Sequence, residues 1–175
     1  MKIKFLGHAS FLITSDQGTR VITDPYRAGC FDGGIRYGAV TEEADIVTIS
    51  HEHDDHNETA IRGKPEFVRG PGKHKVRGIG IEGTPTFHDT GSGKDRGKNT
   101  VFKISMDSLN LVHLGDLGHT LSAQDASAIG TVDILMVPVG GHFTIDAGGA
   151  DSVIDALKPR IVIPMHFSTD KCGFP

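Results

Sequence analysis

The segment Ile49-Ser50-His51-Glu52-His53-Asp54-Asp55-His56 follows an apolar run, Ala44–Ile49, with no turn residue between them. The run predicts a strand that is buried on both faces, because it is continuous rather than alternating. In extended backbone His51 and His53 point the same way, since side chains alternate with period two. Asp55 and His56 come after the strand end, where the chain turns. We therefore expect the first two imidazoles to meet one metal ion and the next two side chains to serve a second ion.

A solvated, charged loop is the competing interpretation of residues 51–56. It would be favoured for a lone histidine, but three histidines and two aspartates within six residues, after a buried strand, favour a metal site. A helical metalloprotease motif is excluded, because it needs a second histidine four residues after the first. Asp55 occupies that position after His51.

The composition predicts one globular domain over residues 1–175. A net charge of −4 argues against a general affinity for nucleic acid, and no apolar run reaches the roughly 20 residues of a membrane helix. Polar residues interrupt Met1–His8 where a signal peptide would be apolar, so we expect a cytoplasmic protein. The two cysteines, Cys30 and Cys172, fit a reducing compartment. With so few thiols, a metal site has to use nitrogen and oxygen ligands.

Short strand signals separated by Gly, Pro and Asp dominate the first half of the chain, and strands alternate with helices in the second half. This order predicts a sandwich of two mixed sheets with helices outside. The expected helices are Ala123–Ile129, capped by Ser122 and stopped by Gly130, then Ile145–Leu157, and a short helix after Asn57. The expected strands are Lys2–Leu6, Ser10–Thr14, Thr19–Thr23, Ala44–Ile49, Gly78–Ile81, Thr100–Ile104, Leu109–His113, Ile134–Val137 and Ile161–Pro164.

Three further ligand-type residues repeat the pattern in which an apolar strand ends and a ligand follows. His88 follows Thr84–Phe87, Asp116 comes just after an apolar strand, and His166 ends the run Ile161-Val162-Ile163-Pro164-Met165-His166. Residues placed in this way collect at one rim of a sheet sandwich. We expect them to complete the site that begins at residues 51–56.

The order of these residues resembles the five motifs of the metallo-β-lactamase superfamily. The motifs are Asp24 after a strand, the HEHDDH run at 51–56, His88, Asp116 and His166. Four further stretches resemble a branch of metal-dependent hydrolases that includes the ascorbate-6-phosphate lactonase. They are FLGHASFLI (Phe5–Ile13), HLGDLG around Asp116, PVGGHFTID (Pro138–Asp146) and IVIPMHF (Ile161–Phe167). The resemblance covers nearly the whole chain.

The resemblance implies an α/β fold of mixed α+β type, the four-layer αβ/βα sandwich, and two divalent ions: Zn²⁺ first, with Mn²⁺ or Fe²⁺ as alternatives. A shortened C-terminus is a departure, because only nine residues follow His166. Two explanations are open: the C-terminal layer is reduced, or a second subunit of a homo-oligomer covers the exposed surface. Asp24 would orient a ligand histidine from behind. The implied ligands are His51, His53 and His88 for the first ion, Asp55, His56 and His166 for the second, and Asp116 as the bridge.

Several other polar residues have both a possible functional role and a possible structural one. His142, on the Gly140–His142 loop, is predicted to contact substrate or move a proton, and a structural role is the equal alternative. His8 has the same two possible roles, and the backbone-bonded one is favoured. His113 is expected in the core or behind the ligands, and His119 and His74 at the surface. Lys94, Arg96 and Lys98 could face an anionic substrate, although a solvated loop is favoured for each alone. The basic stretch Arg62–Arg77 is interpreted as a surface face.

These features predict a dinuclear metal-dependent hydrolase. A hydroxide held between the ions would attack a small, anionic ester, lactone or phosphoester, with Asp55, Asp116 and His142 at the reacting centre. Alternatives are a nuclease or phosphodiesterase that uses Arg62–Arg77, a non-hydrolytic di-iron redox protein, and a silent metal-binding protein. His53 argues against redox iron, because the di-iron relatives place a carboxylate there. The expected partner is a small-molecule substrate, with no membrane and no nucleic acid.

Overall fold

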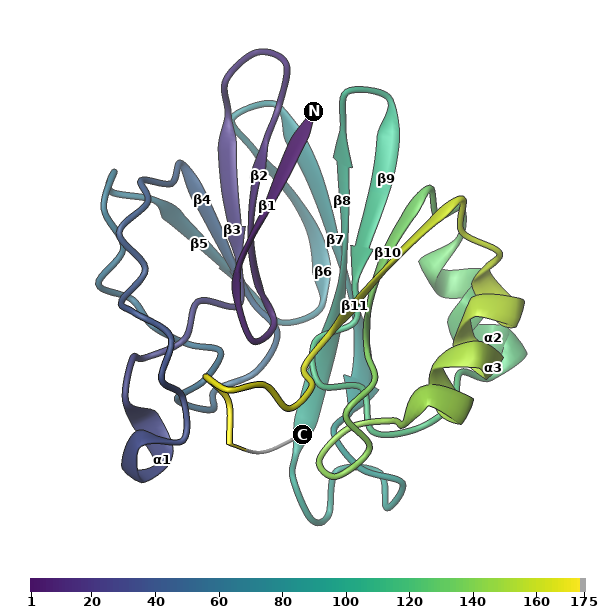
Figure 1. Ribbon diagram of the computed structural model, residues 1–175. Helices are drawn as coiled ribbons and strands as arrows, with labels where there is room; N and C mark the ends of the chain where they lie inside the picture. The colour runs from purple at the N-terminus through teal and green to yellow at the C-terminus, as the bar shows by residue number, and fades with distance from the viewer. Residues whose placement is uncertain (174–175) are drawn as a thin grey trace.

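Eleven strands form two mixed sheets in the computed structural model, which describes residues 1–173 (Figure 1). One sheet has five strands in the order β1-β2-β3-β4-β5; the first three pair antiparallel, and β3, β4 and β5 pair parallel. Its strands are β1 (Lys2–Gly7), β2 (Ser10–Thr14), β3 (Arg20–Thr23), β4 (Ile46–Ile49) and β5 (Glu66–Arg69).

The second sheet has six strands in the order β11-β10-β9-β8-β7-β6. Strands β6 to β9 pair antiparallel, whereas β9, β10 and β11 run parallel. Its strands are β6 (Gly72–Val76), β7 (Ile79–Phe87), β8 (Lys98–Met106), β9 (Leu109–His113), β10 (Ile134–Pro138) and β11 (Ile161–Met165).

Alternating apolar side chains from the two facing sheets make the main core. Phe11 and Ile13 on β2 meet Ile81 on β7 and Phe102 on β8, and all four are buried. Side chains two apart share one face of a strand, so each strand gives its apolar positions to this layer. Burial of this core holds the two sheets face to face.

Two helices cover the outer face of the six-stranded sheet (Figure 1). Helix α2 (Ala123–Ile129) begins at a capping box between Ser122 and Asp125, and α3 (Ala147–Leu157) begins after Asp146, whose side chain accepts from the Gly149 N–H. Strand β10 lies between both cores and is buried along its whole length, as expected for a parallel strand with both faces covered. No helix in the described part of the chain is long and apolar enough to cross a membrane.

The outer face of the five-stranded sheet is covered mainly by loops. Val40, Ala44 and Ile61 from these loops pack on Ile22 and Val47 of the sheet. The helix on this side is α1 (Cys30–Gly33), a single turn in which Phe31, Asp32 and Gly33 have positive φ. The predicted sandwich of two mixed sheets with helices outside is confirmed, and its outer layer on this sheet is thin.

Several strand ends meet at one rim shared by both sheets, at the bottom of Figure 1. Asp24 follows β3, residues 50–56 follow β4, His88 follows β7 and His166 follows β11. Asp116 comes three residues after β9. The parallel direction of β3 with β4, and of β9 with β11 through β10, delivers these side chains to the same edge.

Most predicted strands are confirmed within two residues, but some elements differ. The predicted strand at Gly78–Ile81 and the segment Thr84–Phe87 form one strand, β7, which continues through Gly83 and Pro85. The short helix expected after Asn57 is wrong, because residues 57–61 adopt no regular structure. Helix α3 starts two residues later than predicted, because the Asp146 side chain caps its first turn.

Strands β5 and β6 lie inside Arg62–Arg77, which the sequence presented only as a basic surface. They are the edge strands of the two sheets, and charged side chains on edge strands discourage pairing between molecules. The charges therefore concealed the strand pattern, while the surface interpretation of their basic side chains is confirmed by the exposure of Arg69, Lys73 and Lys75.

Gly118→Ala tests the close packing behind the rim. A Cβ at Gly118 would lie 2.3 Å from the Asp89 backbone nitrogen and 2.3 Å from the His88 carbonyl carbon. Because backbone atoms cannot move aside locally, we expect the free energy of unfolding to fall by about 1–3 kcal/mol. The Tm should fall by roughly 2–4 °C for each kcal/mol. Gly148→Ala, whose Cβ would meet only Asp146 Oδ1 at 3.5 Å in α3, should keep or raise the Tm. Equal Tm values for both variants would contradict this packing.

Candidate metal centre

The carboxylate of Asp116 lies at the centre of a buried cluster of imidazoles. Its Oδ1 lies 3.2 Å from His56 Nε2, and its Oδ2 lies 3.1 Å from His88 Nε2. Two more imidazoles approach Oδ2, with His166 Nε2 at 3.3 Å and His51 Nε2 at 3.6 Å. Imidazoles that follow three different strands, β4, β7 and β11, therefore converge on one carboxylate.

Many of the polar atoms in this cluster have no hydrogen-bond partner among residues 1–173, although they are buried. An unpaired buried polar atom costs about 1–3 kcal/mol, so a concentration of them calls for a ligand. Nitrogen and carboxylate atoms of this kind are ligands for Zn²⁺, Mn²⁺ or Fe²⁺. The unpaired atoms are His51 Nε2, Asp55 Oδ1, His56 Nε2, His88 Nδ1, Asp116 Oδ1 and His166 Nδ1.

The ligand-type atoms fall into groups whose members all lie within 4.8 Å of one another. One group is His51, His53 and His88, which is the predicted first set. The next group is His8, Asp55, His56 and His166, which is the predicted second set with His8 added. Asp116 contacts members of both groups, which is the position of a bridge. A third group, Asp24 with His51 and His56, lies behind the first two.

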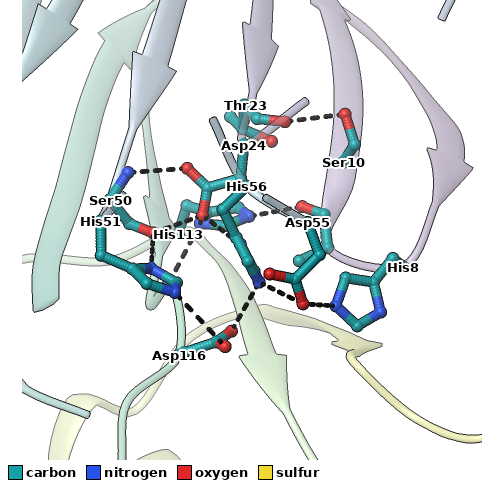
Figure 2. A network of polar contacts seen from close by, with 12 residues as sticks. His8, Ser10, Thr23, Asp24, Ser50, His51, Asp55, His56, His113 and Asp116 are labelled. Carbon is teal, nitrogen blue, oxygen red and sulfur yellow. Dashed lines mark hydrogen bonds and ion pairs between the residues drawn. The ribbon is translucent and has the colours of Figure 1, made fainter. Parts of the chain in front are cut away.

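Asp24 orients two of these histidines from behind (Figure 2). Its Oδ1 accepts from the Ser50 N–H at 2.8 Å, and its Oδ2 accepts from the Ser50 hydroxyl at 2.5 Å and from His56 Nδ1 at 3.0 Å. Because the Ser50 proton points to Asp24, the Ser50 oxygen accepts from His51 Nδ1 at 2.9 Å. Because each Nδ1 bonds to a group behind the cluster, Nε2 is the nitrogen of both His51 and His56 that faces the centre.

His8 belongs to this cluster, so of the two roles that the sequence left open for it, the favoured backbone-bonded role is wrong. Its Nε2 lies 3.0 Å from Asp55 Oδ2, its Nδ1 lies 3.6 Å from Cys172 Sγ, and its ring lies 4.1 Å from the ring of His166 (Figure 2 shows the Asp55 contact). The signal was present in the sequence. His8 directly follows strand β1, in the same way that the other ligand-type residues follow theirs.

Burial and charge set the protonation states. Burial, followed by the nearby His56, lowers the pKa of His51 to about 3, and burial with His166 lowers that of His8 to about 4. Burial alone would raise the pKa of Asp116, but His166 and His56 bring it well below its ordinary value. At His56 burial is outweighed by Asp116 and Asp55, which raise its pKa. Metal ligands must be deprotonated, so a metal would displace a proton mainly at His56.

The remaining histidines lie outside the cluster. His113 is buried behind Asp24, and its Nε2 donates to the Ala9 carbonyl at 2.7 Å, as predicted for a core residue. His119 and His74 are half-buried rather than at the surface, and His119 Nε2 accepts from the Phe87 N–H at 3.3 Å. His142 is exposed, and its ring lies 4.4 Å from that of Phe143. Its predicted catalytic role stays a prediction.

A cavity of about 340 Å³ opens onto the cluster. It leaves the imidazoles accessible from one side while Asp24 and His113 close the other side. A volume of this size suits a small molecule. Its lining residues are Phe31, His53, Asp55, His88, Arg96, Asp116, Phe143 and His166.

Residues 2–166 match the family described as "Beta-lactamase superfamily domain". A UPF0173 metal-dependent hydrolase of Carboxydothermus hydrogenoformans is 29% identical over 97% of this chain and 85% of its own length. A crystal structure from Thermotoga maritima, described as a candidate zn-dependent hydrolase of the metallo-beta-lactamase superfamily, is 36% identical. The match covers 96% of this chain and 76% of the Thermotoga maritima chain, with a TM-score of 0.79.

A more distant structure, the metallo hydrolase Igni18 of Ignicoccus hospitalis, supports the fold alone. It is 22% identical with a TM-score of 0.70, and the match covers 95% of this chain and 82% of that one. The family match spans every strand and every cluster residue described above. The chain therefore belongs to the metallo-β-lactamase superfamily, together with the UPF0173 metal-dependent hydrolases.

Proposed function

We propose that this metal-dependent hydrolase binds two divalent ions in the cluster around Asp116 and cleaves a small anionic ester, lactone or phosphoester. The observation that carries the proposal is the Asp116 carboxylate, within 3.1–3.6 Å of four imidazole nitrogens that come from three strand ends. A buried anion in contact with so many ligand atoms suits a bridge between two cations. The many unpaired atoms around it support the same assignment.

The chain's own residues have two roles in the proposed site: some would bind the ions, and others orient the side chains that bind them. In the proposed site His51, His53 and His88 hold the first ion, Asp55, His56 and His166 hold the second, and Asp116 contacts both. Asp24 positions His51 and His56, and His8 donates to Asp55 and fixes that carboxylate. Divalent ions, when bound, lower the pKa of water to about 7 and polarise the scissile oxygen. Five of the seven proposed ligands line the cavity in which the substrate would react: His53, Asp55, His88, Asp116 and His166.

Zn²⁺ is the ion we propose first, with Mn²⁺ or Fe²⁺ as alternatives. The first group is purely imidazole and the second mixes imidazole with carboxylate, a donor set that suits all three ions. The description of the Thermotoga maritima relative as a candidate zn-dependent hydrolase supports zinc. The resemblance of the Phe5–Ile13 and Pro138–Asp146 stretches to the lactonase branch supports a lactone or phosphate-bearing substrate.

The nuclease alternative loses support, because four of the six cations in the basic stretch are paired with carboxylates. Arg62 lies 3.6 Å from Glu43, and Arg69 lies 3.0 Å from Glu52. Arg77 pairs with Asp45 at 3.4 Å, and Lys73 lies 3.7 Å from Glu82. Paired cations release fewer counterions and bind phosphate backbones weakly. The di-iron β-hydroxylase CmlA shares the fold at 15–16% identity, which supports no redox role here.

Metal removal and a substrate panel test the proposed function. The purified protein should contain about two divalent ions per chain, measured by elemental analysis. Dialysis against a chelator should abolish hydrolysis of at least one ester, lactone or phosphodiester, and Zn²⁺ or Mn²⁺ should restore it. Metal-loaded protein that hydrolyses none of these classes would support the silent metal-binding alternative instead.

Asp116→Ala should reduce occupancy of both metal positions, because one carboxylate serves both. His88→Ala should chiefly empty the first position and leave about one ion per chain. Elemental analysis with circular dichroism distinguishes metal loss from unfolding. His74→Ala, on edge strand β6 away from the cluster, is the matched control and should keep both ions. Retention of both ions by Asp116→Ala would refute the bridge.

Asp24→Asn should weaken metal affinity about 10- to 100-fold while the ligands themselves stay in place. An amide has only one acceptor oxygen and carries no charge. It therefore cannot accept from the Ser50 N–H with one atom and from the Ser50 hydroxyl and His56 Nδ1 with the other. Competition against a chromogenic chelator measures the affinity. Asp151→Asn, an exposed position on α3, makes the same chemical change at a distance. If both variants bind metal as the unaltered protein does, Asp24 has no positioning role.

A further inference from the structure

Two phenyl rings line the cavity that opens onto the side-chain cluster around Asp116. Phe31 comes from α1 beside the five-stranded sheet, and Phe143 comes from the loop before α3 beside the six-stranded sheet. Phe31 is 52% exposed, which is unusual for a large apolar side chain at a rim otherwise rich in charge. Exposed apolar surface beside reactive groups is typical of a ligand-binding wall.

Arg96 lines the same cavity and differs from the other arginines of the described chain. Its guanidinium lies 5.3 Å from the centroid of the Phe143 ring, a cation–π contact that leaves its N–H groups available. It forms no ion pair within residues 1–173, whereas Arg36 donates to the Asp170 carbonyl and the rest pair with carboxylates. The paired arginines are Arg20, Arg27, Arg62, Arg69, Arg77 and Arg160.

The Arg96 backbone is tied to the metal cluster through a neighbouring carboxylate. Asp89 directly follows His88 and is 4% exposed. Its side chain accepts from the backbone N–H groups of Gly91, Gly93 and Asp95 at 2.7, 2.9 and 3.1 Å, and from that of Arg96 at 2.9 Å. The loop is therefore held in one shape, and Arg96 has a defined place relative to His88.

Arg96 also borders a second, outer hollow of about 600 Å³. Lys98 lines this hollow as well, and it forms no ion pair within the part of the chain that the structure describes. His53 lines both hollows, so they adjoin at the first metal group. Positive charge thus lies on the wall that separates the reacting centre from the outer hollow.

We propose that Arg96 binds an oxyanion of the substrate, a carboxylate or a phosphate, that is separate from the bond being hydrolysed, while Phe31 and Phe143 hold an apolar group. This inference rests on the proposed hydrolase function and narrows its substrate class to apolar esters or lactones that carry an additional anionic group. Asp89 acts as the positioning residue for Arg96. A guanidinium suits this task, because its planar donors match an oxyanion in two-point geometry.

Arg96→Gln is the test variant, and Lys94→Gln is its control. Lys94 lies in the same loop, is exposed and lines neither hollow, so both variants remove one charge from one loop. The probes are mono-4-nitrophenyl glutarate and its methyl ester, which share the leaving group and differ in one carboxylate. The measured quantity is kcat/KM for the acid divided by kcat/KM for the methyl ester. Arg96→Gln should lower this ratio about tenfold, chiefly by raising KM for the acid. Lys94→Gln should keep the ratio.

A binding measurement separates this inference from the proposed function. Calorimetry with 4-phenylbutyrate and 3-phenylpropyl phosphate, on metal-loaded protein, needs no turnover. Arg96→Gln should weaken binding of the probe with the preferred oxyanion about tenfold, with metal content unchanged. The probe that loses more affinity shows whether the site prefers a carboxylate or a phosphate. If both probes bind Arg96→Gln as they bind the unaltered protein, the inference is overturned even when hydrolysis is observed. Absence of hydrolysis with a large binding loss would overturn only the proposed function.

The apolar wall and the positioning carboxylate have their own outcomes. Phe31→Ala should raise KM for the acid and for the methyl ester alike, because it removes contact area and no charge. Asp89→Asn should lower the acid-to-ester ratio as Arg96→Gln does, without loss of metal ions, since it loosens the loop and leaves the arginine present. An unchanged KM for both esters in Phe31→Ala would contradict the apolar wall.

Discussion

The architecture depends on the burial of one carboxylate. A carboxylate in an apolar interior is expensive unless cations or donors compensate it, and Asp116 has imidazoles on both oxygens. Those imidazoles come from strands of both sheets, so the two halves of the sandwich have to meet at one rim for the charge to be tolerated. The core of Phe11, Ile81 and Phe102 holds the sheets together behind that rim. Fold and site therefore stabilise one another.

The cluster and its surroundings form three layers, from the innermost ligand-type atoms to the cavity wall. The innermost atoms are ring nitrogens and carboxylate oxygens that face each other without hydrogen bonds of their own within the described residues. Behind them Asp24 and Ser50 fix which nitrogen of His51 and His56 carries a proton, and His8 holds the Asp55 carboxylate. Outside, the cavity wall changes character from metal ligands to phenyl rings and a guanidinium. Such an order separates the common chemistry of the centre from the selection of a substrate.

Much of the site was predictable because its residues follow strands. A strand that ends in a ligand is visible in a sequence, and the ligands expected from residues 51–56, His88, Asp116 and His166 do lie together. His8 follows the same rule after β1, yet one histidine without neighbours gives a weak signal. The edge strands β5 and β6 were hidden by their charges, and the expected helix after Asn57 was a local preference that tertiary contacts overrode. Propensity is a weak guide wherever packing decides.

The sequence by itself determined the two mixed sheets, the capped helix Ala123–Ile129 and the identity of the ligand-type residues, because periodicity, caps and residue chemistry are local properties. Only the tertiary structure decided that Ser50 relays Asp24 to His51, that His8 reaches Asp55, and that Arg96 stands over Phe143. Each of these contacts other than Ser50–His51 joins residues far apart in the chain. Such pairs have no spacing that a sequence can reveal, since their distance depends on how the sheets close upon each other.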